Sequence, residues 1–182
     1  MISADQPTAD AFESAVAEIF DGKAKRSGNC NCGMFYMTKA QRDELTLGFT
    51  LQLVNVARDG DTIHTSWKNG ISLDITKARL SSFPAITARD KNDNLAGWAI
   101  SGRFGQISNE FVVPEHRGIG LGRAVELVQA QQLARKGRRV FKYVEITNEI
   151  VFNTSLRSSN WTMWRENGER KPIYFRKFEI AN

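Results

Sequence analysis

The order of apolar and polar positions along the 182-residue chain predicts a mixture of helices and strands. Between residues 8 and 20, apolar side chains recur at helical spacing, with Thr8 as the expected N-cap and Gly22 as the stop. Residues 23–33 are polar and contain glycine, so we expect a loop there. Residues 48–54 alternate with a period of two, which is typical of a strand.

The middle of the chain predicts two helices followed by an antiparallel meander. The helices are expected over residues 55–67 and 71–82, after which Pro84 interrupts the pattern. Three strand-like segments then follow with short turns between them, which favours antiparallel neighbours. These segments cover residues 85–90, 95–104 and 106–113.

The last third of the chain predicts alternating helices and strands. A long helix is expected from Leu121 to about Lys136, where Gly137 ends it. A buried strand, a helix and a closing strand are expected over residues 139–146, 148–159 and 173–180. This order favours an α/β (α+β) fold with a mixed, mostly antiparallel central sheet flanked by helices.

Composition and charge limit the classes of function. A hydrophobic fraction of 41% and a charged fraction of 25% are typical of a soluble globular domain, and no apolar run approaches the roughly 20 residues that cross a bilayer. We therefore expect no membrane partner. The net charge of +5 favours a phosphate-bearing partner. Nucleic acid is the weaker alternative, because no aromatic or glycine-rich nucleic-acid signature accompanies the basic residues.

Cysteine usage and the N-terminus bear on metal binding and location. Cys30 and Cys32 are too close for an ordinary disulfide, and no Cys or His cluster completes a zinc site, so we expect free thiols and no metal. The first 20 residues carry four acidic side chains and no Lys or Arg. This pattern argues against a secretory signal or a transit peptide and favours a cytoplasmic location.

A glycine-rich loop, VVPEHRGIGLGR (residues 112–123), joins the third meander strand to the long helix. Its glycines let backbone N–H groups approach a phosphate, and the helix N-terminus adds a partial positive charge. A Walker loop is excluded because Arg123 and Ala124 follow the last glycine. A Rossmann fingerprint is excluded because the spacing is G-x-G-x-G and the preceding strands are predicted to be antiparallel.

The segment RGIGLG (residues 117–122) fits the R-x-x-G-x-G pyrophosphate loop of the GCN5-related N-acyltransferase (GNAT) superfamily, and the chain resembles that superfamily. The resemblance implies the GNAT fold over residues 47–182, with a V-shaped opening between the strand before the loop and the strand after its helix. Residues 1–46 are expected to form a helical or irregular extension. The implied co-substrate is acetyl-CoA or another acyl-CoA. The implied binding residues are Val112, Val113, Arg117, Gly118, Ile119, Gly120, Leu121, Gly122, Arg123 and Asn148.

A narrower resemblance is to the glycine N-acyltransferase family. Its matching pieces are Trp67, SSFP (81–84), GW (97–98), VVPEHRG (112–118) and VEITNE (144–149). This resemblance implies a small, glycine-like amine as the acyl acceptor. A mitochondrial location is the alternative that it implies.

The proton-transfer positions depart from what the resemblance implies. The usual general base, a glutamate eleven residues before the loop arginine, falls on Gln106, and the usual acid, a tyrosine, falls on Leu156 next to Ser155. Gln106, Glu145 and Ser155 are therefore the candidate catalytic residues, with Glu145 as the better substitute base. Glu110 is expected on the same strand face as Gln106, about 13 Å away. For Glu110 we favour an ion pair with Arg123 or Lys142, and for Glu145 the same alternative stays open.

We therefore predict an acyl-CoA-dependent N-acyltransferase that acts on a small amine, as a monomer or homodimer. The alternative is a catalytically weak or silent CoA-binding or interaction protein of the same fold, because both usual proton-transfer groups are replaced.

Overall fold

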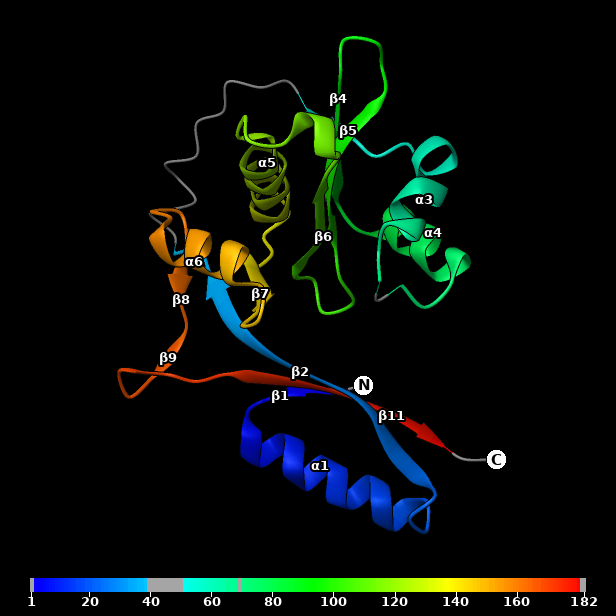
Figure 1. Cartoon of the computed structure of the whole chain (residues 1–182), viewed down its shortest axis with the longest axis vertical. Helices are drawn as coiled ribbons and strands as arrows, with labels where there is room; N and C mark the ends of the chain where they lie inside the picture. The colour runs from blue at the N-terminus through cyan, green and yellow to red at the C-terminus, as the bar shows by residue number, and fades with distance from the viewer. Residues whose placement is uncertain (1, 39–50, 69, 181–182) are drawn as a thin grey trace. The chain divides into compact units, whose positions relative to one another are not determined.

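The computed structural model describes residues 2–38, 51–68 and 70–180. The chain divides into two compact units, which are described separately. The first unit comprises Met1–Tyr36 and Tyr143–Asn182, and the second comprises Met37–Lys142. Figure 1 labels their helices and strands. The predicted boundary at residues 46 and 47, and the start of the strand predicted at 48–54, lie outside the described residues.

The second unit is built on an antiparallel meander with strand order β3-β4-β5-β6. Helices α3 and α4 precede β4 in the sequence, and α5 follows β6 (Figure 1). The three meander strands and both helices before them confirm the sequence prediction. The bounds are β3 Gln52–Leu53, α3 Val56–Thr65, α4 Leu73–Ser82, β4 Ala85–Arg89, β5 Leu95–Ser101, β6 Ile107–Val112, the 3-10 helix η1 Pro114–His116, and α5 Leu121–Arg135.

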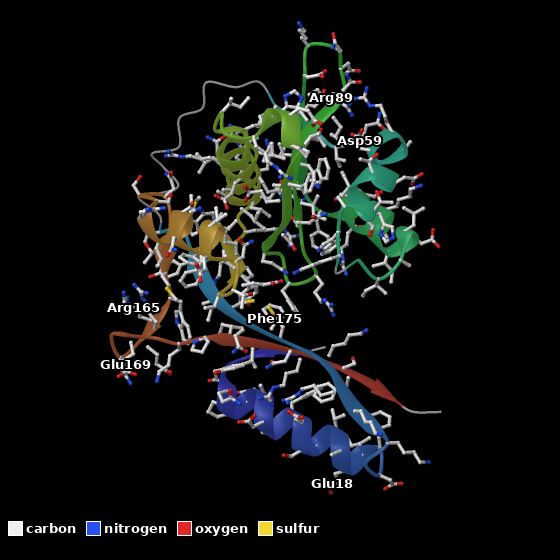
Figure 2. All side chains as sticks on the ribbon, in the orientation of Figure 1. Glu18, Asp59, Arg89, Arg165, Glu169 and Phe175 are labelled. Atoms are coloured by element: carbon white, nitrogen blue, oxygen red, sulfur yellow. The ribbon has the colours of Figure 1, made fainter. Side chains whose placement is uncertain are left out.

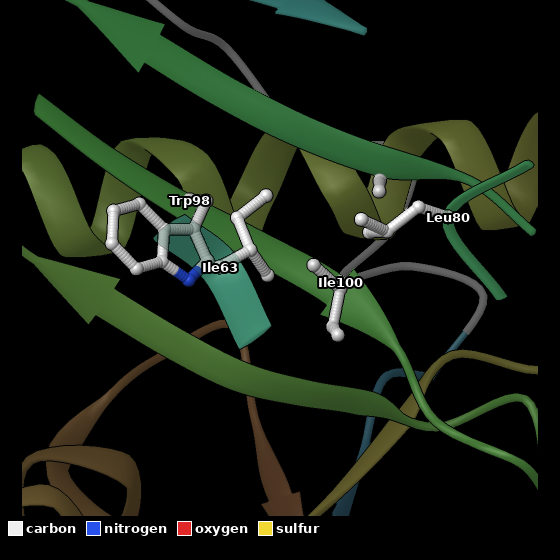
Figure 3. Packing of buried hydrophobic residues seen from close by; sticks show 5 residues of the cluster. Ile63, Leu80, Trp98 and Ile100 are labelled. Atoms are coloured by element: carbon white, nitrogen blue, oxygen red, sulfur yellow. The ribbon is translucent and has the colours of Figure 1, made fainter. Parts of the chain in front are cut away.

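One face of the meander packs against α3 and α4. Ile63 from α3 and Leu80 from α4 meet Trp98 and Ile100 from β5 in a cluster of buried side chains (Figure 3). Trp98 is only 1% exposed, and its ring stacks on Phe111 of β6 with centroids 4.8 Å apart. Full burial of a side chain of this size contributes roughly 1.5–3 kcal/mol, so this cluster fixes α3 and α4 on that face.

A buried ion pair fixes the start of α3 to the end of β4. Asp59 and Arg89 are almost fully buried and bonded to each other (Figure 2). The second oxygen of Asp59 accepts a hydrogen bond from the backbone N–H of Asn55 at 3.1 Å. Removing one partner of such a pair leaves a buried charge uncompensated, which typically costs about 3–5 kcal/mol.

Helix α5 covers the opposite face of the meander. The side-chain amide of Gln129, which is fully buried, donates to the carbonyl of Pro84 at 2.5 Å and to the hydroxyl of Ser101 at 2.8 Å. The helix ends as the sequence predicts, because Gly137 follows with φ of +69°. Ser101 therefore faces α5, and this places alternate residues of β5 on the α5 side.

The first unit pairs the two ends of the chain in one sheet. Strands β1 and β2 lie on either side of β11, both antiparallel to it, and β8 pairs with β2. Strands β9 and β10, which follow β8 in the sequence, form a separate antiparallel pair. The bounds are β1 Ile2–Ala4, α1 Gln6–Ile19, β2 Ala24–Tyr36, α6 Glu149–Arg157, β8 Thr162–Met163, β9 Arg165–Glu166, β10 Glu169–Arg170 and β11 Ile173–Ile180. Strand β7 Phe141–Glu145 begins in the second unit, which includes Phe141 and Lys142, and ends in the first.

The loop predicted at residues 23–33 is wrong, because these residues belong to strand β2. The register with β11 runs from Ala24 opposite Ile180 to Cys32 opposite Ile173, so pairing along the strand overrides its polar, glycine-containing composition. Helix α1 is present as predicted, but its N-cap is Asp5, whose carboxylate accepts from the N–H of Thr8. The predicted cap at Thr8 is therefore wrong by three residues.

Buried Arg176 of β11 holds α1 against the sheet of the first unit. Its guanidinium bonds to Asp10 and Glu13 of α1, each at 2.6 Å. The helices and mostly antiparallel strands of both units agree with the predicted α/β (α+β) class. In the part of the chain that the structure describes, no helix combines the length and the apolar character that a bilayer crossing requires.

Candidate functional site

The loop between β6 and α5 presents a row of backbone N–H groups. Gly118 and Gly120 have φ of +80° and +82°, a conformation that glycine adopts without strain. Gly120 is the N-cap of α5 and provides no side-chain cap. Among the described residues, the N–H groups of residues 118–122 have no hydrogen-bond partner. Uncapped N–H groups at the start of a 15-residue helix are donors of the kind that an anion accepts from.

Arg117 brings a positive charge to this loop. Its Nε donates to the carbonyl of Val112 at 2.9 Å, and its guanidinium lies 5.5 Å from the ring centroid of Phe111. These contacts hold the charged group against the end of β6, while the residue stays exposed. Arg123, in the first turn of α5, is also exposed. Both cations suit a phosphate bound at the helix start.

Next to the loop, one edge of β6 is not paired with β5. Val113 donates its N–H to Ala96 at 2.9 Å, whereas Val112 lies opposite Gly97. Backbone groups alternate between the two edges of a strand, so those of Val112 turn away from β5. At the other end of β6, Ile107 pairs in parallel with Lys142 of β7. The V-shaped opening expected between these two strands stays a prediction.

A β-bulge interrupts β6 between these two ends. Phe111 lies opposite Trp98 and Ser108 lies opposite Ile100, so Asn109 and Glu110 together oppose one residue of β5. Asn109 has φ of +41°, in the left-handed region, and its side-chain amide donates to the carbonyl of Ile63 in α3 at 3.4 Å. The extra residue changes which face of the sheet each following side chain points to.

The bulge turns Glu110 toward α5. A Cβ placed on Gly122 would lie 2.8 Å from the Glu110 Oε1, so the third glycine of the loop motif makes room for this carboxyl group. Before the bulge, Ile107 lies opposite Ser101, which faces α5, so Gln106 points to the other face. The expectation that Gln106 and Glu110 share a face is therefore wrong, because it assumed an uninterrupted period of two.

Glu110 belongs to a cluster of three ionisable side chains. Glu126 of α5 and Lys142 of β7 form a buried ion pair, each 6% exposed. Lys142 therefore pairs with Glu126 and not, as we favoured, with Glu110. Its positive charge still lowers the pKa of Glu110. Lys142 was named in the sequence only as a partner for Glu110 or Glu145, and Glu126 was not singled out. A glutamate one helical turn after the last loop glycine, near a lysine within an apolar strand, is the signal that could have found them.

The cluster raises the pKa of Glu110 to about 8. The largest cause is burial of its carboxyl group, followed by the negative charge of Glu126, while Lys142 acts in the opposite direction. The Glu110 residue is exposed, and its carboxyl group adjoins Gly122 and Glu126. Because the like charge of Glu126 and a hydrogen bond between the two carboxyl groups also favour the neutral form, the direction does not depend on burial alone.

The side chain of Gln106 is engaged in the turn between β5 and β6. Its Oε1 accepts from the N–H of Phe104 at 3.0 Å, and its backbone carbonyl accepts from the N–H of Gly102 at 2.8 Å. A Cβ on Gly102 would collide with the side-chain amide of Gln106. Glutamine at this position thus stabilises the hairpin. Its predicted role toward a substrate amine stays a prediction.

The other predicted site residues lie in the first unit. Asn148 is the N-cap of α6, with its Oδ1 accepting from Val151 N–H at 3.4 Å, and Ser155 is buried in the same helix. Glu145 ends β7 and is half-buried. The structure thus brings the loop residues 117–123 together with Val112 and Val113 in the second unit. The catalytic roles of Glu145 and Ser155, and the binding role of Asn148, stay predictions.

Comparisons with known proteins agree with this geometry at the level of the fold. The family model described as FR47-like protein matches residues 86–152, which is less than half of the chain. A search of curated proteins found no match.

Solved structures cover nearly the whole chain at low identity. The chain is similar to a Drosophila protein with a TM-score of 0.75 and 14% identity, over 94% of this chain and 58% of that one. It is also similar to an acetyltransferase of the GNAT family from Colwellia psychrerythraea, with a TM-score of 0.60 and 12% identity over 99% of this chain and 64% of that one. For a GCN5-related N-acetyltransferase from Sphaerobacter thermophilus, the TM-score is 0.56 and the sequence identity is 13%, over 98% of this chain and 59% of that one. The chain has the GNAT fold and spans about three fifths of these proteins' lengths.

The contact between Gly122 and Glu110 predicts a strong coupling between these positions. Gly122→Ala gains helix propensity of roughly 1 kcal/mol but forces a methyl group against the carboxyl group, which typically costs about 1–3 kcal/mol. We expect Gly122→Ala to be neutral or destabilising in the native protein and stabilising in the Glu110→Ala background. Urea unfolding of the four proteins measures this, and additive effects of the two substitutions would contradict the contact.

Proposed function

We propose that the chain is an N-acyltransferase that moves an acetyl or longer acyl group from coenzyme A to a small amine. The observation that carries the proposal is the uncapped start of α5, where Gly118 and Gly120 hold successive N–H groups without partners among the described residues. A pyrophosphate is the anion that such a row of donors fits, with Arg117 and Arg123 beside it. The GNAT fold and the names of the similar acetyltransferases support the same reading.

The pantetheine arm would lie along the open edge of β6. The N–H of Val112 turns to this edge, whereas its carbonyl already accepts from Arg117 and the N–H of Val113 is bonded to Ala96. We therefore assign the main backbone contact to the N–H of Val112. The bound acyl-CoA would supply the thioester, and the chain would supply its alignment with the amine, which can account for more rate than proton transfer does.

A glycine-like acceptor fits the cations on the face that Gln106 points to. Arg79 of α4 lies over the ring of Trp67 at 5.2 Å, and Arg103 lies over Phe104 at 5.6 Å. Partial burial, and secondarily the like charge of Arg103, lower the pKa of Arg79. Two neighbouring guanidinium groups attract a carboxylate, so the acceptor we propose is an amine that carries one.

Substitutions at two glycines test the loop. Gly120 and Gly137 both have positive φ and open space around them, and they lie at opposite ends of α5. Glutamate at either position adds the same strain and charge, but only Gly120→Glu puts the charge among the proposed phosphate-binding N–H groups. Calorimetry should show that Gly120→Glu weakens acetyl-CoA binding at least about 100-fold, while Gly137→Glu changes it less than about threefold. No binding of acetyl-CoA by the native protein at millimolar concentration would refute the proposed function.

The acceptor is tested by release of free CoA thiol with glycine and with glycinamide, which lacks the carboxylate. Arg79→Gln should raise the KM for glycine about tenfold or more, through loss of a charge-assisted hydrogen bond, and leave glycinamide unaffected. Arg135→Gln, which removes an exposed charge at the far end of α5, serves as the control. Equal effects on both amines would exclude the carboxylate site. Binding of acetyl-CoA without thiol release for any amine would favour the catalytically silent alternative.

A further inference from the structure

The Glu110, Glu126 and Lys142 side chains form an ionisable group that the anion-binding loop does not need. Structural lysines and glutamates usually form exposed pairs, whereas here a third carboxyl group adjoins a buried pair. Two ionised carboxylates beside one lysine would repel each other, so the arrangement is favourable only if Glu110 or Glu126 is protonated. Strongly perturbed carboxyl groups of this kind are concentrated at functional sites.

The position of Glu110 along β6 relates it to the reacting end of the proposed ligand. An arm that enters at the loop follows the open edge from Val112 toward Ile107, where pairing with Lys142 closes that edge. The reacting group must therefore stop before Ile107. Glu110 lies two residues from Val112, or about 7 Å, and the bulge is at the same place. The residue is exposed there, with its carboxyl group beside Gly122.

We infer that Glu110 is a catalytic acid of the acyl transfer, a role that rests on the proposed function and replaces the acid missing at Leu156. The amine nitrogen forms a bond to the acyl carbon, and the carbon–sulfur bond breaks with its electron pair on sulfur. Neutral Glu110 gives its proton to that sulfur and becomes a carboxylate. The proton that the amine nitrogen loses passes to solvent, and solvent then reprotonates Glu110.

The surrounding charges suit this role. A thiol ordinarily titrates near 8.5, and the pKa of Glu110 at about 8 is close to that, which is the condition for efficient proton transfer. Glu126 from α5 keeps the proton on Glu110, and Lys142 from β7 stabilises the carboxylate once the proton has left. One negative neighbour, Glu126, thus favours the protonated form of Glu110, and one positive neighbour, Lys142, favours its carboxylate.

Glu110→Gln keeps the size of the side chain and removes its proton, so it tests the acid directly. We expect kcat to fall on the order of 100-fold, while calorimetric binding of acetyl-CoA changes less than about threefold. In the native protein, kcat should fall as pH rises through about 8, because the protonated form is the active one. This decline should be absent in Glu110→Gln. Glu18→Gln removes an exposed charge on α1 and serves as the control.

Two further measurements separate catalysis from a purely structural role. Glu126→Gln removes a charge that raises the pKa of Glu110, so the decline in kcat should begin at lower pH. Carboxyl carbon-13 NMR, assigned by loss of the signal in Glu110→Gln, should show titration of Glu110 near pH 8. Adding CoA should shift that titration more than adding desulfo-CoA, which lacks the sulfur.

The outcomes distinguish this inference from the proposed function. If acetyl-CoA binds and Glu110→Gln keeps the native kcat and pH profile, Glu110 is not the acid and the proposed function stands. If CoA and desulfo-CoA shift the titration equally, the sulfur does not lie at Glu110 and the inference is also overturned. If acetyl-CoA does not bind the native protein, both proposals fail.

Discussion

The β-bulge at Asn109 is the constraint on which the arrangement of the second unit depends. Three residue steps along β5, from Trp98 to Ser101, match four along β6, from Phe111 to Ile107. The extra residue lets Phe111 stack on Trp98 and at the same time turns Glu110 toward α5. A regular strand in the same register at Ile107 would point Glu110 into the apolar side beneath α3 and α4. Within the six residues of β6, Phe111 therefore faces the apolar cluster under α3 and α4, and Glu110 faces the charged side under α5.

The acid cluster and the proposed anion-binding loop lie at the same end of α5. Gly122 belongs to the first turn of that helix and contacts the Glu110 carboxyl group, and Glu126 follows one turn later. An ionised Glu110 would repel a phosphate bound at the helix start, and a neutral one would not. The charges that favour the protonated form of Glu110 thus also favour binding of an anion, so the proposed ligand binding and the proposed proton transfer are linked through one side chain. This link follows from packing alone and does not require any movement of the loop.

The sequence predicted most of the second unit because its elements are marked by strong local signals. Asn55 and Ser72 cap α3 and α4, as expected where a polar side chain precedes an apolar helical pattern. The loop was identifiable because its R-x-x-G-x-G spacing stands between a strand pattern and a helix pattern. Strand β2 was missed because its polar residues become a strand only through pairing with β11, more than 140 residues away in the chain.

The missing part of the candidate site has a similar cause. A bulge depends on the register of two strands, so no local pattern around Asn109 reveals it, and the face of Glu110 was predicted wrongly. The cluster of Glu110, Glu126 and Lys142 joins a strand, a helix and a second strand, and its members are ordinary charged residues in the sequence. Gln106 was singled out by its spacing from Arg117, whereas its contacts place its side chain in a turn.

The central claim is that the start of α5 binds the pyrophosphate of coenzyme A through its backbone. Titration of the nitrogen-15-labelled protein with CoA, followed by amide NMR, tests this most directly. We predict the largest shifts at Gly118, Gly120 and Leu121, whose N–H groups have no partner among the described residues, and at Val112 on the strand edge. Gly137, at the other end of the helix, should not shift. Saturable binding of CoA that leaves the amides of residues 118–122 unchanged would contradict the account.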